Sequence, residues 1–159
     1  MDILHPAFVH FPIGLLSLYT LLESLSILKF MRKKLHTAKI LLLGFGVIAT
    51  FLTRLTGEHD EDYFIHETPA LEMHEELSFF VVVFFGALIC VYILEWLIAT
   101  KKIKSNMLFS IATSQYVKII LAVVGFGILT TVGALGGSLV HGADADPMIR
   151  FITNLLGVS

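Results

Sequence analysis

Histidine is the residue type through which this sequence could do chemistry. The chain of 159 residues contains seven histidines, and an imidazole can ligate a metal ion or a haem iron, or exchange a proton near neutral pH. Two of them, His5 and His10, lie in the opening segment HPAFVHFP. Others lie close to the ends of later hydrophobic stretches, at His59, His74 and His141. This pattern predicts a site built from histidines at one end of the hydrophobic elements.

Two kinds of ligand suit these imidazoles. Haem b takes one axial imidazole from each of two helices, and we expect His10 and His74 to supply them, with His5, His59 and His141 as alternates. A compact Zn or Cu site takes about three or four imidazoles, which His5, His10, His74 and His141 could provide. Neither an H-x3-H nor an HExxH spacing is present. Both ligand types therefore stay open, as does a structural role in which each imidazole bonds to a neighbouring group.

A few other polar side chains narrow the choice of ligands. Cys90 is the only cysteine, so neither an intrachain disulfide nor a thiolate metal site can form. Any metal must be held by imidazoles and carboxylates such as Glu72 or Glu75. Arg54 lies near the end of an apolar run, where it could pair with a haem propionate or with Glu58, or extend its guanidinium to the membrane interface.

Two glutamates lie inside apolar stretches, far from the histidines. Glu23 and Glu95 lie near those ends of their stretches that are away from the histidines. We expect them to pair with lysines such as Lys29 or Lys101; a proton path is the alternative interpretation.

The composition indicates that lipid surrounds the elements that carry these residues. The chain is 56% hydrophobic and only 15% charged, where soluble domains are about a quarter charged, and its mean hydropathy is +0.84. Stretches of about 20 apolar residues can cross a hydrocarbon core of about 30 Å, and in lipid they must be helical. Four spans are predicted, at about 6–28, 38–56, 77–99 and 115–140.

Charge is distributed unevenly between the two ends of these spans. Nine of the eleven basic residues lie after the first and third spans, and the positive-inside rule makes that side cytoplasmic. The opening residues lack the basic region of a signal peptide, so we expect the first span to remain as a helix. The sequence therefore predicts a multi-pass protein of the bacterial inner (cytoplasmic) membrane with both termini outside, on the side of the histidines.

The glycines and the C-terminal residues complete the expected fold. Glycines in the second and fourth spans, including the GxxxG pair Gly133 and Gly137, favour close helix packing; the alternative is space for a flat cofactor. Asp146 can cap a short helix that begins at Pro147. We expect an all-α integral membrane four-helix bundle at 1–142, followed at 143–159 by a short amphipathic helix on the outer surface.

The segment HPAFVHFPIGLL resembles the opening signature of a bacterial membrane-domain family of unknown function, roughly H-P-x-x-V-H-F-P-I. The resemblance continues in the TPA tripeptide before His74 and in the GGSLVHG stretch that contains His141. It implies a four-helix membrane domain. Members are sometimes fused to Rieske or c-type cytochrome domains, which implies electron transfer and favours haem over a lone metal ion. Carried over by position, the family histidines are His5, His10, His74 and His141.

We therefore expect a cytochrome b-like membrane electron-transfer protein with haem b at its outer end. An iron with two histidine ligands has no open position, so we expect an electron carrier rather than an enzyme. No CxxCH motif is present, so its redox partner would be a separate protein at the outer face. The alternatives are a Zn- or Cu-binding membrane protein and a structural subunit without a cofactor. Nothing indicates a nucleic-acid partner, and a homo-oligomer stays open.

Overall fold

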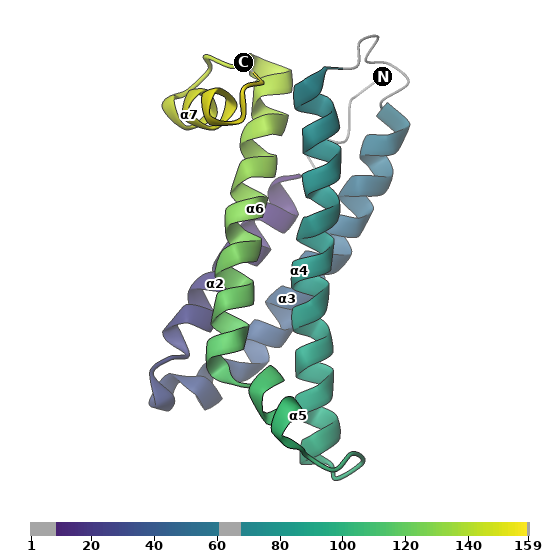
Figure 1. Cartoon of the computed structure of the whole chain (residues 1–159), viewed down its shortest axis with the longest axis vertical. Coiled ribbons are helices and arrows are strands. Elements are labelled where there is room, and N and C mark those ends of the chain that lie inside the picture. The colour runs from purple at the N-terminus through teal and green to yellow at the C-terminus, as the bar shows by residue number, and fades with distance from the viewer. Residues whose placement is uncertain (1–8, 61–67, 159) are drawn as a thin grey trace.

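The computed structural model describes residues 9–60 and 68–158, with the backbone alone at residues 56–60. The regular elements in these ranges are helices (Figure 1). They are α2 (His10–Leu25), α3 (Lys29–Asp60), α4 (Pro69–Ala99), α5 (Met107–Ala112), α6 (Gln115–His141) and α7 (Pro147–Leu156). The expected all-helical class and the short C-terminal helix are confirmed.

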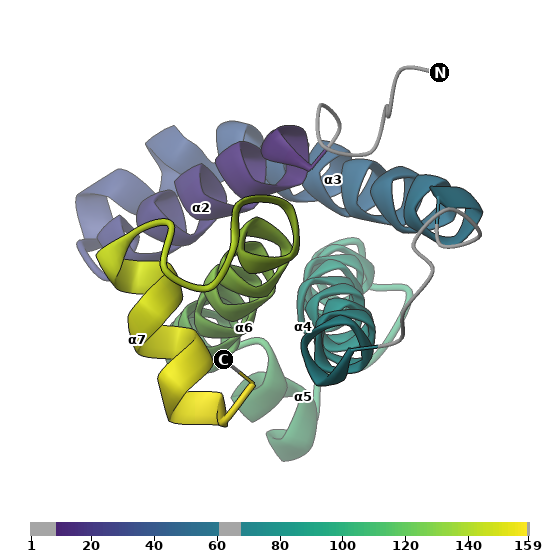
Figure 2. The ribbon, with the colours of Figure 1, turned by 90° about the horizontal axis from the view of Figure 1, so that it is seen from above.

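The long helices form a bundle of two layers. Seen from above, α2 and α3 lie along one side, with α6 and α4 beneath them (Figure 2). The strongest packing is between α4 and α6 and between α2 and α3, and further contacts join α2 to α6 and α3 to α4. Helices α2 and α4 are therefore diagonal neighbours, and α7 packs against α6 alone among the major contacts.

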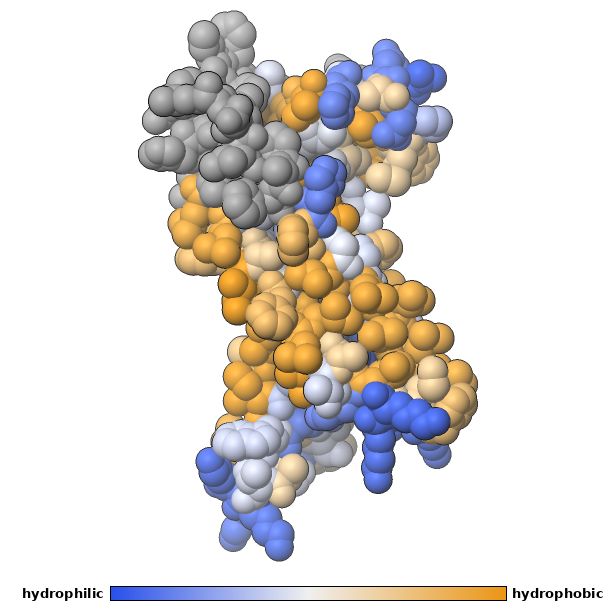
Figure 3. All heavy atoms as spheres, turned by 180° about the vertical axis from the view of Figure 1, so that it is seen from behind, coloured by the Kyte–Doolittle hydropathy of each residue, from blue (hydrophilic) through white to orange (hydrophobic). Residues whose placement is uncertain are grey.

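The core is apolar along most of the bundle. Its buried side chains come from α2, α3, α4 and α6, and are Leu16, Tyr19, Leu43, Val81, Phe85, Leu88, Tyr92, Ala122 and Leu129. The outer surface is also apolar around the middle, with hydrophilic side chains at both ends (Figure 3). A helix that is apolar on all sides is typical of a membrane span. In the described residues, three segments are long and apolar enough to cross a membrane: Lys29–Leu55, Pro69–Ala99 and Gln115–His141.

Helices α4 and α7 begin at capping residues, and the start of α7 at Pro147 agrees with the expectation. Helix α4 begins at Pro69 after Thr68, whose hydroxyl accepts a hydrogen bond from the Leu71 amide at 3.3 Å. Helix α7 begins at Pro147 after Asp146, whose carboxylate accepts from two amides at 2.7 and 3.0 Å. Both helices thus combine a capping side chain with a proline at the first helical position.

The first two spans differ from the expectation. Helix α2 ends at Leu25, and the basic segment expected as a loop is the beginning of α3, which starts at Lys29. Lysine, arginine, leucine and methionine are good helix formers, and the Arg32 guanidinium fastens the turn by donating to the Ser26 carbonyl at 3.1 Å. The start expected at Pro6 lies outside the described residues. The 16 residues of α2 are not among the three candidate spans.

The short helix α5 was not predicted. It lies between the third and fourth spans, where a loop was expected, and Asn106 caps it by accepting from the Phe109 amide at 2.8 Å.

The glycines mark places where helices pack closely. A Cβ added at Gly46 would lie 2.8 Å from Cγ of Leu16 on α2, and one at Gly125 would lie 3.1 Å from the Phe85 ring on α4. One at Gly137 would lie 2.9 Å from Ile149 on α7. Side chains of this chain fill these spaces, which supports the packing interpretation.

Gly46→Ala should destabilise the bundle, because the added methyl group would overlap Leu16, which is fully buried. Overpacking of this kind costs about 1–3 kcal/mol. Gly44→Ala is the matched control on the same helix, since nothing lies within 4 Å of its added Cβ. Thermal unfolding of both variants in one detergent measures the difference. Equal melting temperatures for the two variants would contradict the close α2–α3 contact.

Candidate functional site: a buried charge cluster and the histidine end

The histidine-bearing ends of the helices gather at one end of the bundle. Helix α3 ends one residue after His59, α4 begins five residues before His74, and α6 ends at His141. These three ends lie together at the top of Figure 1. The side chain of His59 lies outside the described residues, as do His5 and His66.

His10, which we expect as an axial ligand, lies on the side of α2 that faces away from the core. It is the first residue of α2 and is exposed. At about 100° per residue, it lies about 180° around the helix from Tyr19, whose side chain is fully buried. Helix rotation therefore directs His10 away from the core. His141 is likewise exposed.

His74 is the histidine that the fold holds between helices. It is half-buried, and its Nδ1 lies 3.0 Å from the carbonyl oxygen of Val132 on α6. Because a carbonyl only accepts, Nδ1 carries the proton, and in the neutral ring Nε2 carries the lone pair. A Cβ on Gly136 would lie 3.0 Å from the His74 ring. The glycine therefore lets the imidazole lie against α6.

The remaining expected ligands do not form a compact metal site within the described part of the chain. There, no group of three or more His, Cys, Asp or Glu side chains could hold a metal ion. Arg54 is half-buried, with its guanidinium 5.6 Å from the centre of the Phe79 ring. This cation–π contact holds Arg54 at the histidine-bearing end of α3.

The most highly organised polar site lies toward the other end of the bundle. Glu23 on α2 is fully buried, and Lys39 on α3 is 2% exposed. The Lys39 ammonium lies 3.0 Å from Oε2 of Glu23. The Tyr92 hydroxyl on α4 donates to the same oxygen at 2.6 Å, and Nε2 of Gln115 on α6 donates to Oε1 at 2.5 Å. We call these four residues the Glu23 cluster.

A second ion pair lies beside the Glu23 cluster. The Lys118 ammonium is 7% exposed and donates to Oε1 of Glu95 at 2.7 Å. The same ammonium lies 5.0 Å from the centre of the Tyr92 ring, and that of Lys39 lies 5.8 Å from it. Tyr92 therefore connects the two pairs through its hydroxyl and its ring. A negative charge in a low-dielectric interior is tolerated only when it is paired and hydrogen-bonded, and Glu23 meets both conditions.

The partners expected for the glutamates were wrong. Lys29 and Lys101 are exposed, and the actual partners are Lys39 and Lys118. Because the basic segment is helical, Lys39 lies about 15 Å further along α3 than Lys29. The sequence does carry a signal for the pairing: Lys39 and Lys118 lie at edges of apolar stretches, as Glu23 and Glu95 do.

One further buried hydroxyl, that of Tyr19, lies beside the Glu23 cluster. Tyr19 is fully buried, with its ring 6.1 Å from that of Phe85. The group interacts electrostatically with both Glu23 and Tyr92.

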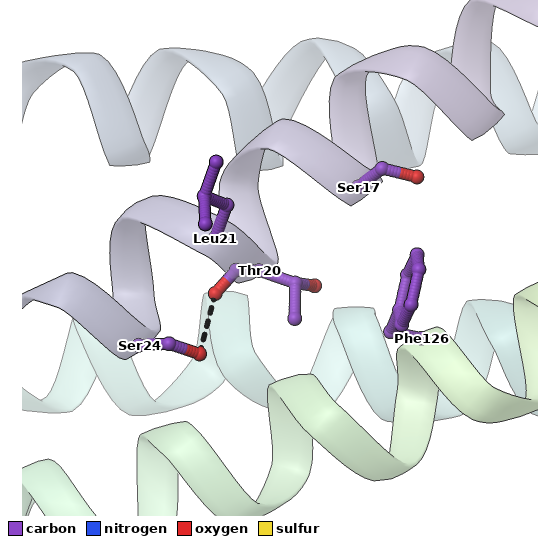
Figure 4. A pocket seen from close by; sticks show the side chains of 5 residues that line it. All are labelled: Ser17, Thr20, Leu21, Ser24 and Phe126. Carbon is purple, nitrogen blue, oxygen red and sulfur yellow. Dashed lines mark hydrogen bonds between the residues drawn. The ribbon is translucent and has the colours of Figure 1, made fainter.

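A hollow on the outside of α2 and α6 is not an alternative site. Its volume is about 270 Å³, and Ser17, Thr20, Leu21, Ser24 and Phe126 line it (Figure 4). Two of its hydroxyls bond to the backbone: that of Ser24 donates to the Thr20 carbonyl at 2.8 Å, and that of Thr20 to the Leu16 carbonyl at 2.9 Å. No histidine or charged group lines it.

A family model matches residues 2–145 of this bundle, and its description is "Predicted membrane protein (DUF2231)". The chain belongs to this family. The match covers nearly the whole sequence and confirms the resemblance to a membrane family of unknown function. No curated protein and no solved structure matches the chain. The chain is thus a membrane protein in a lipid bilayer, which is consistent with the three candidate spans.

Removing one partner of the Glu23 cluster should be far more harmful than removing both charges. In Lys39→Met the Glu23 carboxylate stays buried without its cation, and breaking a buried pair costs about 3–5 kcal/mol. In Glu23→Gln/Lys39→Met no charge is left unpaired, so we expect most of the stability to return. Thermal unfolding of both variants in detergent makes the comparison. A double variant no more stable than Lys39→Met would contradict the pairing.

Proposed function

We propose that this chain is a membrane electron-transfer protein that binds haem b at the histidine-bearing end, with His74 as one axial ligand. The observation that carries the proposal is the fixed imidazole of His74 between α4 and α6. Metal-ligating histidines usually donate their other ring N–H to a carbonyl or carboxylate, which fixes the tautomer. The Val132 carbonyl acts in this way on Nδ1, and Nε2 is the nitrogen suited to the iron.

The second ligand would come from another histidine at the same end. His10 and His141 are exposed, so neither faces His74 across the apolar core. A haem held by one of them would lie at the rim of the bundle, and His5 and His59 are the other candidates. When bound, haem supplies one-electron exchange at the iron. The chain's own residues would orient the ring: Val132 fixes the imidazole, Gly136 leaves room beside it, and Arg54 is the cation suited to a propionate.

The membrane topology completes the proposal. We keep the predicted count of four spans, of which α2 is part of the first, in a bacterial inner membrane protein. Nine of the eleven basic residues lie toward the end of the bundle opposite the histidines, which supports a cytoplasmic lysine end and outer termini. The redox partner would then meet the chain at the outer face, beside α7. There Met148, Phe151 and Leu155 are exposed and could also rest on the lipid interface.

His74→Ala should abolish haem binding, because the variant loses the imidazole that, among the described histidines, is fixed between α4 and α6. The measurement is the absorption spectrum and haem content of protein purified after expression with ample haem. His36→Ala is the matched control, since His36 is exposed toward the lysine end and its loss should leave the spectrum unchanged. A wild-type protein without Soret and α bands would contradict the haem proposal. Zn or Cu found in its place by elemental analysis would select the metal-binding alternative.

The proposed topology predicts that the C-terminus lies outside. Alkaline phosphatase fused after the last residue should be active, because the enzyme folds only outside the cytoplasm, and a fusion after Ile103 in the α4–α5 connection should be inactive. The measurement is the phosphatase activity of each fusion relative to the amount of that fusion protein. The reverse pattern would place the histidine-bearing end in the cytoplasm.

A further inference from the structure

We propose that a groove between α3 and α4 binds an anionic phospholipid, with an acyl chain in the groove and the phosphate among basic side chains at its mouth. The mouth lies toward the lysine-bearing end of the bundle. The occupant comes from the bilayer in which this membrane protein resides. The inference does not rest on haem binding, because it concerns residues that the proposed haem site does not use.

The groove is an apolar hollow of about 170 Å³ on the outside of the bundle. Its lining residues come equally from α3 and α4, and are Ile40, Leu43, Gly44, Ile89, Tyr92 and Ile93. Gly44 keeps the hollow open, because a Cβ added there would meet nothing within 4 Å. Ile40 and Ile93 are exposed, so the walls face the surrounding medium. In a bilayer this medium is hydrocarbon, and an acyl chain is the apolar group that reaches the hollow.

Basic side chains continue the α3 wall of the groove beyond its apolar part. The members of this wall are three or four residues apart and therefore share one face of the helix; they are Lys29, Lys33, His36, Ile40 and Leu43. The centre of the His36 ring lies 6.0 Å from that of the Tyr92 ring on α4, so this face borders the groove. Lys33 is exposed and lies about 10 Å beyond Ile40 along the helix axis. A lipid whose chain lies at Ile40 thus has its phosphate within reach of Lys33.

Helix α4 carries matching features of a membrane interface. Trp96 is the only tryptophan of the chain, is 54% exposed, and lies one turn beyond Tyr92 toward the lysine-bearing end. The Lys102 ammonium lies 4.3 Å from the centre of the Trp96 ring. Tryptophan is enriched at the boundary between hydrocarbon and headgroups. Trp96 therefore marks the depth at which the groove passes from acyl chain to headgroup.

The basic mouth needs a negative charge from outside the chain. The sequence has one acidic residue in positions 3–57, which is Glu23, and one in positions 77–143, which is Glu95. Each of the two is paired with a buried lysine in or beside the Glu23 cluster. Groups of lysines next to a membrane span attract anionic lipids. Because the apolar hollow adjoins these lysines, the site favours a lipid over a water-soluble phosphate.

The fluorescence of Trp96 tests the proposal, because this single tryptophan lies at the mouth of the groove. The whole chain is reconstituted in phosphatidylcholine vesicles that contain a small fraction of lipid brominated on its acyl chains, which quenches tryptophan on contact. Brominated phosphatidylglycerol should quench with an apparent affinity at least about fivefold higher than that of brominated phosphatidylcholine. Equal quenching by the two lipids would overturn the proposal.

Lys33→Gln should weaken the apparent affinity for phosphatidylglycerol about fivefold, which is the contribution of one lysine near an anionic lipid. Lys34→Gln is the matched control. Lys34 is also exposed and carries the same charge, but it lies about 100° further around α3, away from the groove. Its loss should leave the preference close to that of wild type. An equal loss in both variants would overturn the site, because general attraction to the basic end would then explain the binding.

Gly44→Leu tests the place of the acyl chain. The added side chain would fill the hollow, so the preference for phosphatidylglycerol should be lost. Gly127→Leu on α6 is the matched control, since nothing lies within 4 Å of a Cβ added there either, and it should keep the preference. Circular dichroism checks that both variants remain helical. An unchanged preference in Gly44→Leu would overturn the assignment of the acyl chain to the groove, as would release of the lipid from wild type by water-soluble glycerol phosphate.

Discussion

The bundle depends on the need to satisfy one buried carboxylate. Helices in lipid gain little from hydrophobic burial against each other, so close packing and polar contacts decide how they associate. The Glu23 carboxylate is reached by an ammonium from α3, a hydroxyl from α4 and an amide from α6. Because a buried charge must be paired, the rotation of all four helices is restricted to the arrangement that brings these donors together.

Close packing of the helices at glycines adds to the restraint that the Glu23 cluster places on their arrangement. Gly46 lets α3 approach Leu16 on α2, and Gly125 lets α6 approach Phe85 on α4. These contacts lie in the apolar core that separates the Glu23 cluster from His74. The two ends of the bundle are therefore chemically distinct. One end holds paired charges, and the other holds an imidazole that is hydrogen-bonded to a backbone carbonyl.

Structural features that depend on neighbouring residues in the chain could be predicted from the sequence. Features that depend on contacts between helices could not. Helices α4 and α7 begin where a capping residue precedes Pro69 and Pro147, because capping involves only neighbouring residues. The orientation of His10 could not be predicted, since the rotation of α2 depends on contacts made by Leu16, Tyr19 and Glu23. The lysine partner of Glu23 was also missed. The basic segment looks like a loop in the sequence, whereas in the structure it is the first part of α3 and carries Lys39 into the bundle. The haem and metal ligands stay predictions.

Helix α6 contacts both the Glu23 cluster and His74. It carries Gln115 of the Glu23 cluster and, 17 residues later, Val132, whose carbonyl holds His74. At about 1.5 Å per residue these positions are about 25 Å apart along the helix, and the core between them is apolar. No break interrupts α6 between the two positions, so the amide that donates to Glu23 and the carbonyl that holds His74 have a fixed separation on one helix.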